Sequence, residues 1–421
     1  MSAPAVEGTA VGAARGLGVR LLLVLALLAA TAPLSVDFYL ASFPEVRSSL
    51  HTDASTVQLT LTGFLLGLGV GQVAWGPISD RYGRLRPLLI GATIGTIAAA
   101  GAALAPTIGI LIAARFVQAL AGAAGIVICR AVIADLLEGY AAARAMSLML
   151  TINGLAPIAA PVVGGALAGH VPWRGVLGII VAVYFVQLVG IVLVIRESLP
   201  ASRRTPRVQY AYIGRLLARP AYLGYTVTSM FAFGAMMAYI SSSSFVYQSV
   251  IGTSGLGYGL LFAFNAVGLM AGGAASARLA RHQVHPARTV SRALPVIVVG
   301  AVFLLLIASA DVTKWLLIVP LFFIVTAVGF VIGNVQTLAI EQSRDVAGAG
   351  SAVVGGLTFL FAGVVSPLGG LKGDDTAVPF ALVMLCSAAC ALGVFVLTRG
   401  YVRRHPDLER SFQRVAVDAS V

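Results

Sequence analysis

Twelve long apolar runs follow one another along this chain, separated by short polar segments. Each run is close to the roughly 20 residues that a helix needs to cross the hydrocarbon core of a bilayer. Because lipid offers no partners to backbone N–H and C=O groups, each run is expected to form a helix that satisfies its own backbone. The runs cover residues 20–43, 54–76, 87–105, 107–130, 145–169, 173–196, 220–247, 255–280, 289–310, 315–339, 346–371 and 377–399.

The composition agrees with an all-α membrane protein, because 59% of the 421 residues are hydrophobic and only 10% are charged. Its mean hydropathy is +0.95, which a soluble fold of this size does not need. The three cysteines all lie in apolar runs, so no disulfide framework is expected. The five histidines show no metal-ligand spacing, and no Gly-rich phosphate loop ending in Gly-Lys-Ser/Thr occurs. We therefore expect no metal, no cofactor and no enzymatic activity, and an ATP-driven pump is disfavoured.

The largest interruption between apolar runs divides the chain into two halves of six runs each. It covers residues 197–219 and contains five arginines. This division predicts an N-terminal six-helix bundle over residues 1–196, a linker over 197–219, and a C-terminal six-helix bundle with a tail over 220–421. Two such bundles can face each other across a cavity near the middle of the membrane.

The distribution of basic residues predicts that both chain termini lie in the cytoplasm. With that orientation, 23 of the 28 Lys and Arg residues fall on the inner side, as the positive-inside rule requires. Four fall outside, namely Arg47, Arg174, Lys314 and Lys372, and Arg115 lies within a span. The net charge of +12 is therefore interpreted as membrane orientation and not as nucleic-acid binding. We expect a monomer in a bacterial cytoplasmic membrane.

A charged segment, Gly76–Arg86, separates the second and third runs. Glycine permits a positive φ and close approach, and the prolines at positions 77 and 87 suit helix ends. One interpretation is a charged turn that only sets the topology. The alternative comes from a resemblance, because Gly76, Asp80, Arg81, Gly83 and Arg84 are similar to the signature between the second and third helices of the major facilitator superfamily. Leu85 departs from that signature, and Arg86 supplies a basic residue one position later.

This resemblance implies a transporter of two six-helix bundles, in which the charged segment acts as a gate. It would hold the ends of the bundles together when the cavity faces outward. Asp80 is expected to add to this by capping the N-terminus of a neighbouring helix.

Asp37 is the only carboxylate well inside an apolar run. A charge at such a depth costs about 2.5–3.5 kcal/mol on insertion scales, so burial should favour the neutral, protonated form. A carboxyl that gains and loses a proton inside a transporter is a natural coupling group. The alternative is an acid near the outer interface that simply reaches water.

Arg115, in the fourth run, lies at a depth similar to that of Asp37. By helical rise, Asp37 is about 10 Å inside Pro44 and Arg115 about 13 Å inside Pro106. The two side chains are therefore expected to communicate, either as a direct pair or through a polar network. Arg115 and Gln118 also resemble a second superfamily motif, Arg-x-x-Gln-Gly, whose arginine is implicated in proton transfer in the family; Ala119 replaces its glycine.

The fifth run resembles the antiporter signature of the superfamily, Gly-Pro-x-x-Gly-Gly. Pro161, Gly164 and Gly165 match it, Ala160 replaces its first glycine, and Pro157 lies one turn earlier. In the family this motif separates exporters from importers. The alternative is a proline-kinked packing face of small residues.

Nearly the whole chain, from about residue 20 to 400, is similar to the Bcr/CflA branch of the drug:proton antiporters. The resemblance rests on Asp37-Phe38-Tyr39-Leu40, on Val57–Thr62, on Arg130–Asp135 and on the stretch that ends at Asn265. Ala41 departs from it, since the branch usually has proline there. That branch exports compounds such as chloramphenicol and bicyclomycin.

The hypothesis for function is proton-coupled export of small amphipathic drugs by alternating access. Aromatic faces with few polar groups suit variable, apolar ligands. Possible drug contacts are Tyr39, Phe64, Asn153, Tyr239, Asn265 and Asn334. The runner-up is a proton-coupled solute symporter on the same fold, and a non-transporting receptor or scaffold is a third class.

Overall fold

The computed structural model describes residues 19–137, 139–205, 211–310, 312–343, 346–371 and 376–405. Within these ranges the fold is helical. Within them, eleven helices are long and apolar enough to cross a membrane, and Gly154–Leu167, the later part of the helix Gly139–Leu167, is a shorter apolar segment. The predicted all-α membrane architecture is confirmed.

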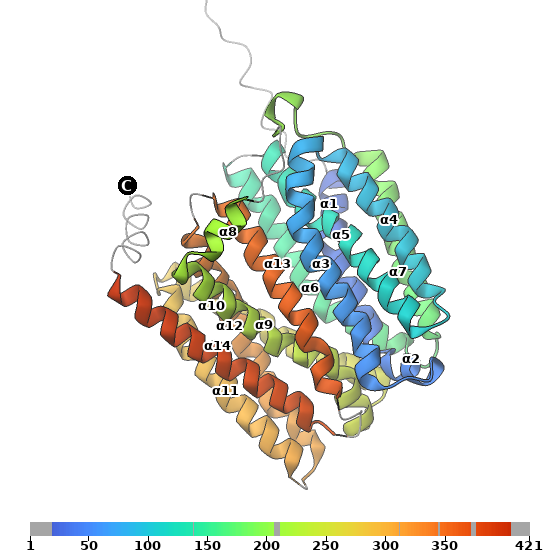
Figure 1. The fold of residues 1–421 in the computed structure, drawn as a ribbon. Helices are drawn as coiled ribbons and strands as arrows, with labels where there is room; N and C mark the ends of the chain where they lie inside the picture. The colour runs from blue at the N-terminus through green and yellow to red at the C-terminus, as the bar shows by residue number, and fades with distance from the viewer. Residues whose placement is uncertain are drawn as a thin grey trace, which may run out of the picture.

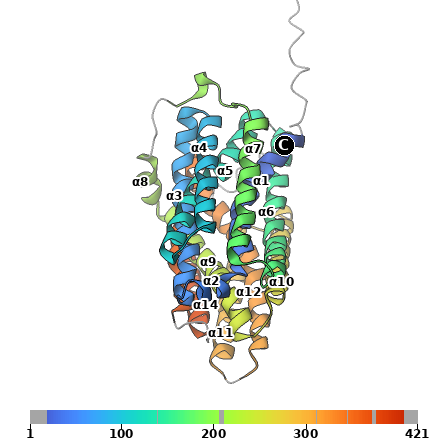
Figure 2. The ribbon, with the colours of Figure 1, turned by 90° about the vertical axis from the view of Figure 1, so that its right-hand side faces the viewer.

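The N-terminal half contains α1 to α7, and its long helices stand side by side (Figures 1 and 2). Packing joins α3 to α5, α4 to both α5 and α7, and α1 to α6. The bounds are α1 Val19–Leu40, α2 Phe43–Ser49, α3 Ala54–Tyr82, α4 Leu85–Ala103, α5 Ile108–Leu136, α6 Gly139–Leu167 and α7 Trp173–Val194.

The C-terminal half contains α9 to α14, and packing joins α9 to α14 and α11 to α12. The two halves meet along two helix pairs, α6 with α10 and α3 with α13. The bounds are α9 Pro220–Phe245, a π-helical turn Val246–Val250, α10 Gly255–Arg281, α11 Pro286–Ser309, a short 3-10 turn Lys314–Leu317, α12 Ile318–Glu341, α13 Ala347–Val365, a second 3-10 turn Ser366–Gly370 and α14 Val378–Arg404.

The charged segment differs from its prediction as a turn between helices. Helix α3 continues through Pro77 to Tyr82, so Asp80 and Arg81 lie in its last turn. Pro77 removes one backbone donor, but the end of the helix is held by the Arg84 guanidinium, which donates to Ser79 Oγ and Asp80 Oδ1. The interpretation of Pro77 as a helix end is therefore wrong, and the break is confined to Gly83 and Arg84.

Two short helices stand where the sequence predicts none. Helix α2 follows the first span directly, and its Phe43 and Val46 are buried against the long helices. Helix α8, Ala211–Leu217, lies within the predicted linker. The linker's 3-10 turn, Ala201–Arg203, lies at the end of the N-terminal half opposite α2 (Figures 1 and 2).

Candidate functional site

A cavity of about 320 Å³ lies between the two halves. Helices α1, α3, α5 and α6 line it from one side, and α9, α10, α12 and α13 from the other. Its polar lining groups are Asp37, Gln72, Arg130 and Tyr239. The remaining lining is apolar and includes Phe64, Phe233, Met236, Met237, Phe262 and Phe359. An apolar pocket with few polar groups suits a small amphipathic molecule.

Among the described residues, Asp37 is the one carboxylate that lines this cavity. Its side chain projects from α1 and is only 4% exposed. Pro33, one turn earlier on α1, lines the cavity as well. Tyr239 and Phe262 of the other half line the same cavity. The carboxyl group is therefore placed at the seam between the two halves, which suits a group that responds to their relative movement.

Arg115 is fully buried on α5 and does not line the cavity. Its Nη2 donates to the backbone oxygen of Ser35 at 2.7 Å, and its Nη1 donates to Gln118 Oε1 at 3.0 Å. The guanidinium also lies over the rings of Phe64, at 4.4 Å, and Tyr39, at 5.2 Å. No ion pair joins it to Asp37 among the described residues. Of the two predicted arrangements, the structure therefore favours a network.

The network links Arg115 to the cavity by two routes. The first is the Ser35 carbonyl, which belongs to the same turns of α1 as Asp37. The second is Phe64, whose ring contacts the guanidinium and also lines the cavity. A cation held against aromatic faces away from water keeps a defined position.

Some of the predicted drug contacts line the cavity, and others do not. Phe64 and Tyr239 line the cavity, whereas Tyr39, Asn265 and Asn334 are not among the lining residues. Asn334 Nδ2 donates to Ser276 Oγ at 2.6 Å and to the Phe330 carbonyl at 2.7 Å. The side chain of Asn153 lies outside the described residues. The role of each in drug binding stays a prediction.

Asn265 positions the tyrosine that faces the cavity. Its Nδ2 donates to Tyr239 Oη at 3.1 Å and to Tyr247 Oη at 2.8 Å. The Tyr239 ring stacks on Phe262 with 5.4 Å between centroids. All of these side chains are buried, so the amide keeps the Tyr239 hydroxyl in a fixed direction.

The small residues on α6 allow backbone-to-backbone packing with two neighbouring helices. A Cβ on Gly164 would lie 2.4 Å from the Phe38 oxygen of α1. A Cβ on Gly165 would lie 2.3 Å from the Gly255 oxygen of α10, and Pro157 lines the cavity. On the facing helix, a Cβ on Gly259 would lie 2.3 Å from the Pro161 oxygen. This motif therefore forms part of the contact between the two halves.

Contacts between the halves gather at the end that carries α2. Gln58 Nε2 donates to Ser242 Oγ at 3.3 Å, and Gln248 Nε2 donates to the Ala41 oxygen at 3.2 Å. Phe43 packs against Phe245 with 6.0 Å between ring centroids. Toward the opposite end, the ribbons of the two halves diverge (Figure 1). The structure therefore represents a state that is closed at the α2 end.

At the opposite end, Arg84 joins two helices of the N-terminal half. Its Nη1 donates to Asp80 Oδ1 at 2.5 Å, and its Nε donates to Asp135 Oδ2 at 2.9 Å. Ser198 Oγ donates to the same Asp135 oxygen at 2.9 Å. The Asp80 carboxylate therefore pairs with Arg84, and the expectation that it caps a neighbouring helix is wrong. Packing in this state does not require a glycine at position 76, since a Cβ there would meet only Val127, at 3.9 Å.

The helix cap in this region comes from Glu197, just beyond α7. Its carboxylate accepts from the backbone N–H of Arg84 at 2.8 Å and of Leu85 at 3.3 Å, at the N-terminus of α4. Partial burial favours the neutral acid, but the backbone donors outweigh it and hold the pKa of Glu197 below its ordinary value. Gly83 makes the approach possible, because it adopts φ +89° and a Cβ there would lie 2.3 Å from Glu197 Oε2.

Several of these residues were not identified from the sequence. Gln72 and Arg130 face the cavity, and Glu197 caps α4. The signal for Arg130 was present, since it lies at the end of an apolar run within a stretch that resembles the Bcr/CflA branch. Nothing local marks Glu197 as a cap, because the α4 amides that it binds are more than 100 residues away in the sequence.

Comparison with known proteins identifies a family and several relatives. The model of the Major Facilitator Superfamily matches residues 25–367. The chain is 34% identical over 382 residues to the uncharacterized MFS-type transporter YdgK of Bacillus subtilis, covering 89% of this chain and 94% of that protein. It is 28% identical over 382 residues to a bicyclomycin resistance protein homolog of Haemophilus influenzae, covering 90% and 96%. A chloramphenicol resistance protein of Pseudomonas aeruginosa is 29% identical over 249 residues, 57% of each chain.

Solved structures share the fold at low sequence identity. The nucleoside transporter NupG superposes with a TM-score of 0.70 at 11% identity, covering 90% of this chain and 98% of that one. A D-xylose-proton symporter superposes with a TM-score of 0.67 at 14% identity, covering 88% and 96%. At such identities the likeness concerns the fold alone.

Proposed function

Because the chain belongs to the Major Facilitator Superfamily, we propose that it exports small amphipathic drugs in exchange for protons. The chain is a multi-pass membrane transporter and not an enzyme. Relatives named for bicyclomycin, chloramphenicol and multidrug resistance support drugs as the substrate class. The excess of arginine on one side of the spans supports a bacterial cytoplasmic membrane with both termini in the cytoplasm.

The observation that carries the proposal is the position of Asp37. In the part of the chain that the structure describes, it is the one carboxylate lining a cavity that both halves build, and it is nearly buried there. An ionised carboxylate among apolar neighbours is costly unless a proton or a cationic partner neutralises it. Proton loading and drug loading of the same cavity therefore compete.

The proposed cycle needs two states of the cavity and no bound cofactor. The state described by the structure is closed at the α2 end, which the arginine distribution places outside, so we assign it as inward-facing. In this state the proton leaves Asp37 and a drug enters from the cytoplasm. Rocking of the halves about the α6–α10 and α3–α13 contacts then opens the cavity outward. The drug leaves, Asp37 takes up a proton, and the protein returns to the inward-facing state. A monomer can carry out this whole cycle.

Arg115 and the Arg84 network have supporting roles in this cycle. Arg115 donates a hydrogen bond to the Ser35 carbonyl of α1, two residues before Asp37. This bond fixes the α1 backbone and thereby the position of the Asp37 carboxyl group. Arg84, Asp80 and Asp135 hold the inner ends of α3 and α5 together, which lets the N-terminal half move as one unit.

A test uses everted membrane vesicles with an acidified lumen. Addition of chloramphenicol or bicyclomycin to wild-type vesicles should release protons from the lumen. Asp37→Asn cannot exchange a proton, so its drug-dependent release should fall to the level of vesicles without the transporter. Equal membrane insertion of the variant is checked by its yield and its unfolding temperature.

Asp37→Glu is the matched control, because it keeps a titratable carboxyl group at nearly the same place. It should retain part of the exchange. Drug-dependent proton release by Asp37→Asn at the wild-type rate would overturn the role of Asp37. If the wild-type protein accumulates solute with protons and releases none from the lumen on drug addition, it is instead a symporter.

A further inference from the structure

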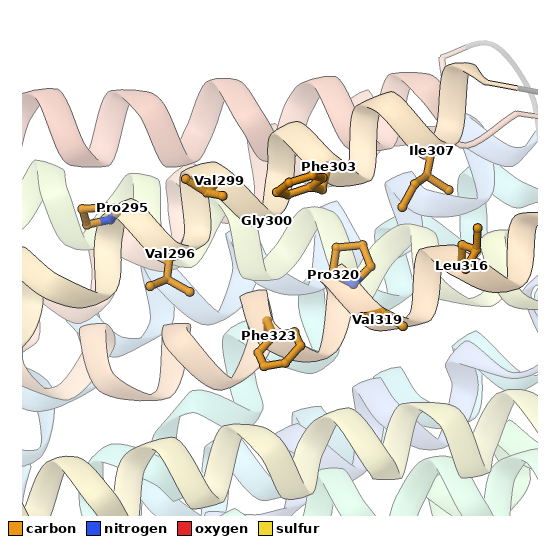
Figure 3. A pocket seen from close by; sticks show the side chains of 10 residues that line it. All are labelled: Pro295, Val296, Val299, Gly300, Phe303, Ile307, Leu316, Val319, Pro320 and Phe323. Carbon is orange, nitrogen blue, oxygen red and sulfur yellow. The ribbon is translucent and has the colours of Figure 1, made fainter. Parts of the chain in front are cut away.

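A long apolar groove runs along the outer face of the C-terminal half, between α11 and α12. Its volume is about 550 Å³, and all ten residues that line it are apolar (Figure 3). It shares no lining residue with the central cavity. The groove extends along α11 from Pro295 to Ile307, about 18 Å by helical rise.

Close packing of the two helices at Gly300 forms the floor of this groove. Gly300 of α11 faces α12, and a Cβ there would lie 2.7 Å from the side chain of Ile324. Pro295 and Pro320 also line the groove, while Phe303 and Phe323 form its walls. Val299 and Phe303 are more than half exposed, so the groove is open to the bilayer.

One end of the groove leads to a basic pocket. Val296 and Phe323 line both the groove and a second pocket of about 310 Å³, which contains Arg292 and Thr289. Arg292 is exposed and has no carboxylate partner among the described residues. The two pockets together offer an apolar slot that is longer than the hydrocarbon thickness of one leaflet, half of about 30 Å, with a guanidinium at its end.

Arg292 lies in a long stretch of sequence that has no acidic residue. No Asp or Glu occurs between residues 198 and 310, a stretch that includes Arg292. A phosphate bound at Arg292 would therefore meet no carboxylate from this stretch of the chain. Arginine also binds phosphate oxygens through two parallel hydrogen bonds.

We propose that this composite groove binds one anionic diacyl phospholipid, with an acyl chain between α11 and α12 and the phosphate at Arg292. The proposal does not depend on drug export, since it concerns the outer surface of one half. Basic pockets between membrane helices are known to hold anionic headgroups. A lipid held there would cover the outer side of the contact between α11 and α12.

The test is a titration of the delipidated protein in detergent, followed by mass spectrometry of the intact complex. Phosphatidylglycerol and phosphatidylcholine with identical acyl chains are the probes. One phosphatidylglycerol should bind more tightly than phosphatidylcholine. Arg292→Gln should reduce that preference about tenfold, the effect of losing one charged hydrogen bond. Val299→Trp, which fills the groove, should weaken the binding of both lipids.

Two variants on the same helix are matched controls, because they lie outside both pockets. Arg288→Gln removes an equal charge four residues away, and Val302→Trp adds an equal bulk to a lipid-facing position; both should bind phosphatidylglycerol like the wild type. Equal affinity for the two lipids, or an equal effect of Arg288→Gln and Arg292→Gln, would overturn the proposal. So would unchanged binding by Val299→Trp, or a change in its oligomeric state in place of lipid loss.

Discussion

At the scale of single residues, Asp37 and Arg115 act on the same segment of α1 from different sides. Asp37 faces the cavity. Arg115 does not line it, but binds the Ser35 backbone and contacts the ring of Phe64, which does. Their similar depth was predicted from helical rise, but their separation into a cavity group and a supporting group was not. The arginine therefore influences the proposed proton exchange through position and not as a paired charge.

Arg115→Lys tests this role, because lysine keeps the charge and loses the planar fork that reaches Ser35 and Gln118 together. We expect drug-dependent proton release to fall about tenfold or more, as one lost charged hydrogen bond is worth roughly 1.5–3 kcal/mol. The measurement is the initial rate in everted vesicles at equal protein content. A wild-type rate would mean that charge alone matters at this position.

At the scale of helices, the packing of α6 against α10 depends on glycines that face each other across the two halves. Gly165 approaches Gly255, and Gly259 approaches Pro161, with no side chain between the backbones. Such contacts let one helix move past another with little rearrangement of side chains. The small-residue motif on α6 predicted a smooth face, and its partner on α10 became apparent only in the fold.

Gly259→Ala should disturb this contact, since its Cβ would lie 2.3 Å from the Pro161 oxygen. Overpacking of this kind costs about 1–3 kcal/mol, so we expect a lower unfolding temperature in detergent and slower transport. Gly273→Ala, on the same helix, is the control, because its Cβ would meet only the Gly329 oxygen at 3.9 Å. Equal effects of the two substitutions would contradict a specific role for the α6–α10 contact.

The cap that Glu197 supplies to α4 makes the stability of the N-terminal half dependent on pH. The pKa of this carboxyl group lies below its ordinary value of 4.5. Its contribution is therefore complete above pH 4.5 and is lost as the pH falls through the lowered pKa. Glu197→Ala should lower the free energy of unfolding by about 1 kcal/mol at pH 7, as typical for a lost helix cap.

Thermal unfolding of wild type and variant between pH 7 and pH 3 measures this effect. The difference between the two should shrink as the solution becomes more acidic than pH 4.5. Glu197→Gln keeps an acceptor oxygen without the charge, and it should give an intermediate stability with a weaker dependence on pH. A difference that stays constant over the whole range would show that the charge of Glu197 has no part in the cap.

At the scale of the whole molecule, the two halves touch at the α2 end and diverge at the other (Figure 1). The cavity between them is lined by eight helices, four from each half. If the proposed cycle operates, the end that is now closed must open while the other end closes. A transporter of this kind therefore has two distances that change in opposite directions.

Spin labels can follow these two distances after the three native cysteines are replaced. Labels at Arg86 and His282 report on the divergent end, and labels at Ser49 and Gly252 on the α2 end; all four positions are exposed. When a drug or a pH change shifts the population toward the outward-facing state, the first distance should shorten and the second should lengthen. Two distances that remain fixed under all conditions would rule out rocking of the halves.

The sequence alone determined the helical membrane fold, because the length of an apolar run and the absence of hydrogen-bond partners in lipid leave few alternatives. It also indicated Asp37 and Arg115, since charges inside apolar runs are costly and stand out. The boundaries were less certain where proline and glycine occur near a helix end. Helix α3 passes Pro77 and ends only at Gly83, where the backbone takes a positive φ.

Which side chains face the cavity and which support it became apparent only from the packing of the helices. Tyr239 and Asn265 are 26 residues apart, yet one lines the cavity and the other holds its hydroxyl. Glu197 reaches the N-terminus of α4 across 113 residues of chain. Local patterns record burial and helix period, but the rotation of each helix about its axis and the choice of its neighbours depend on how all the spans pack together.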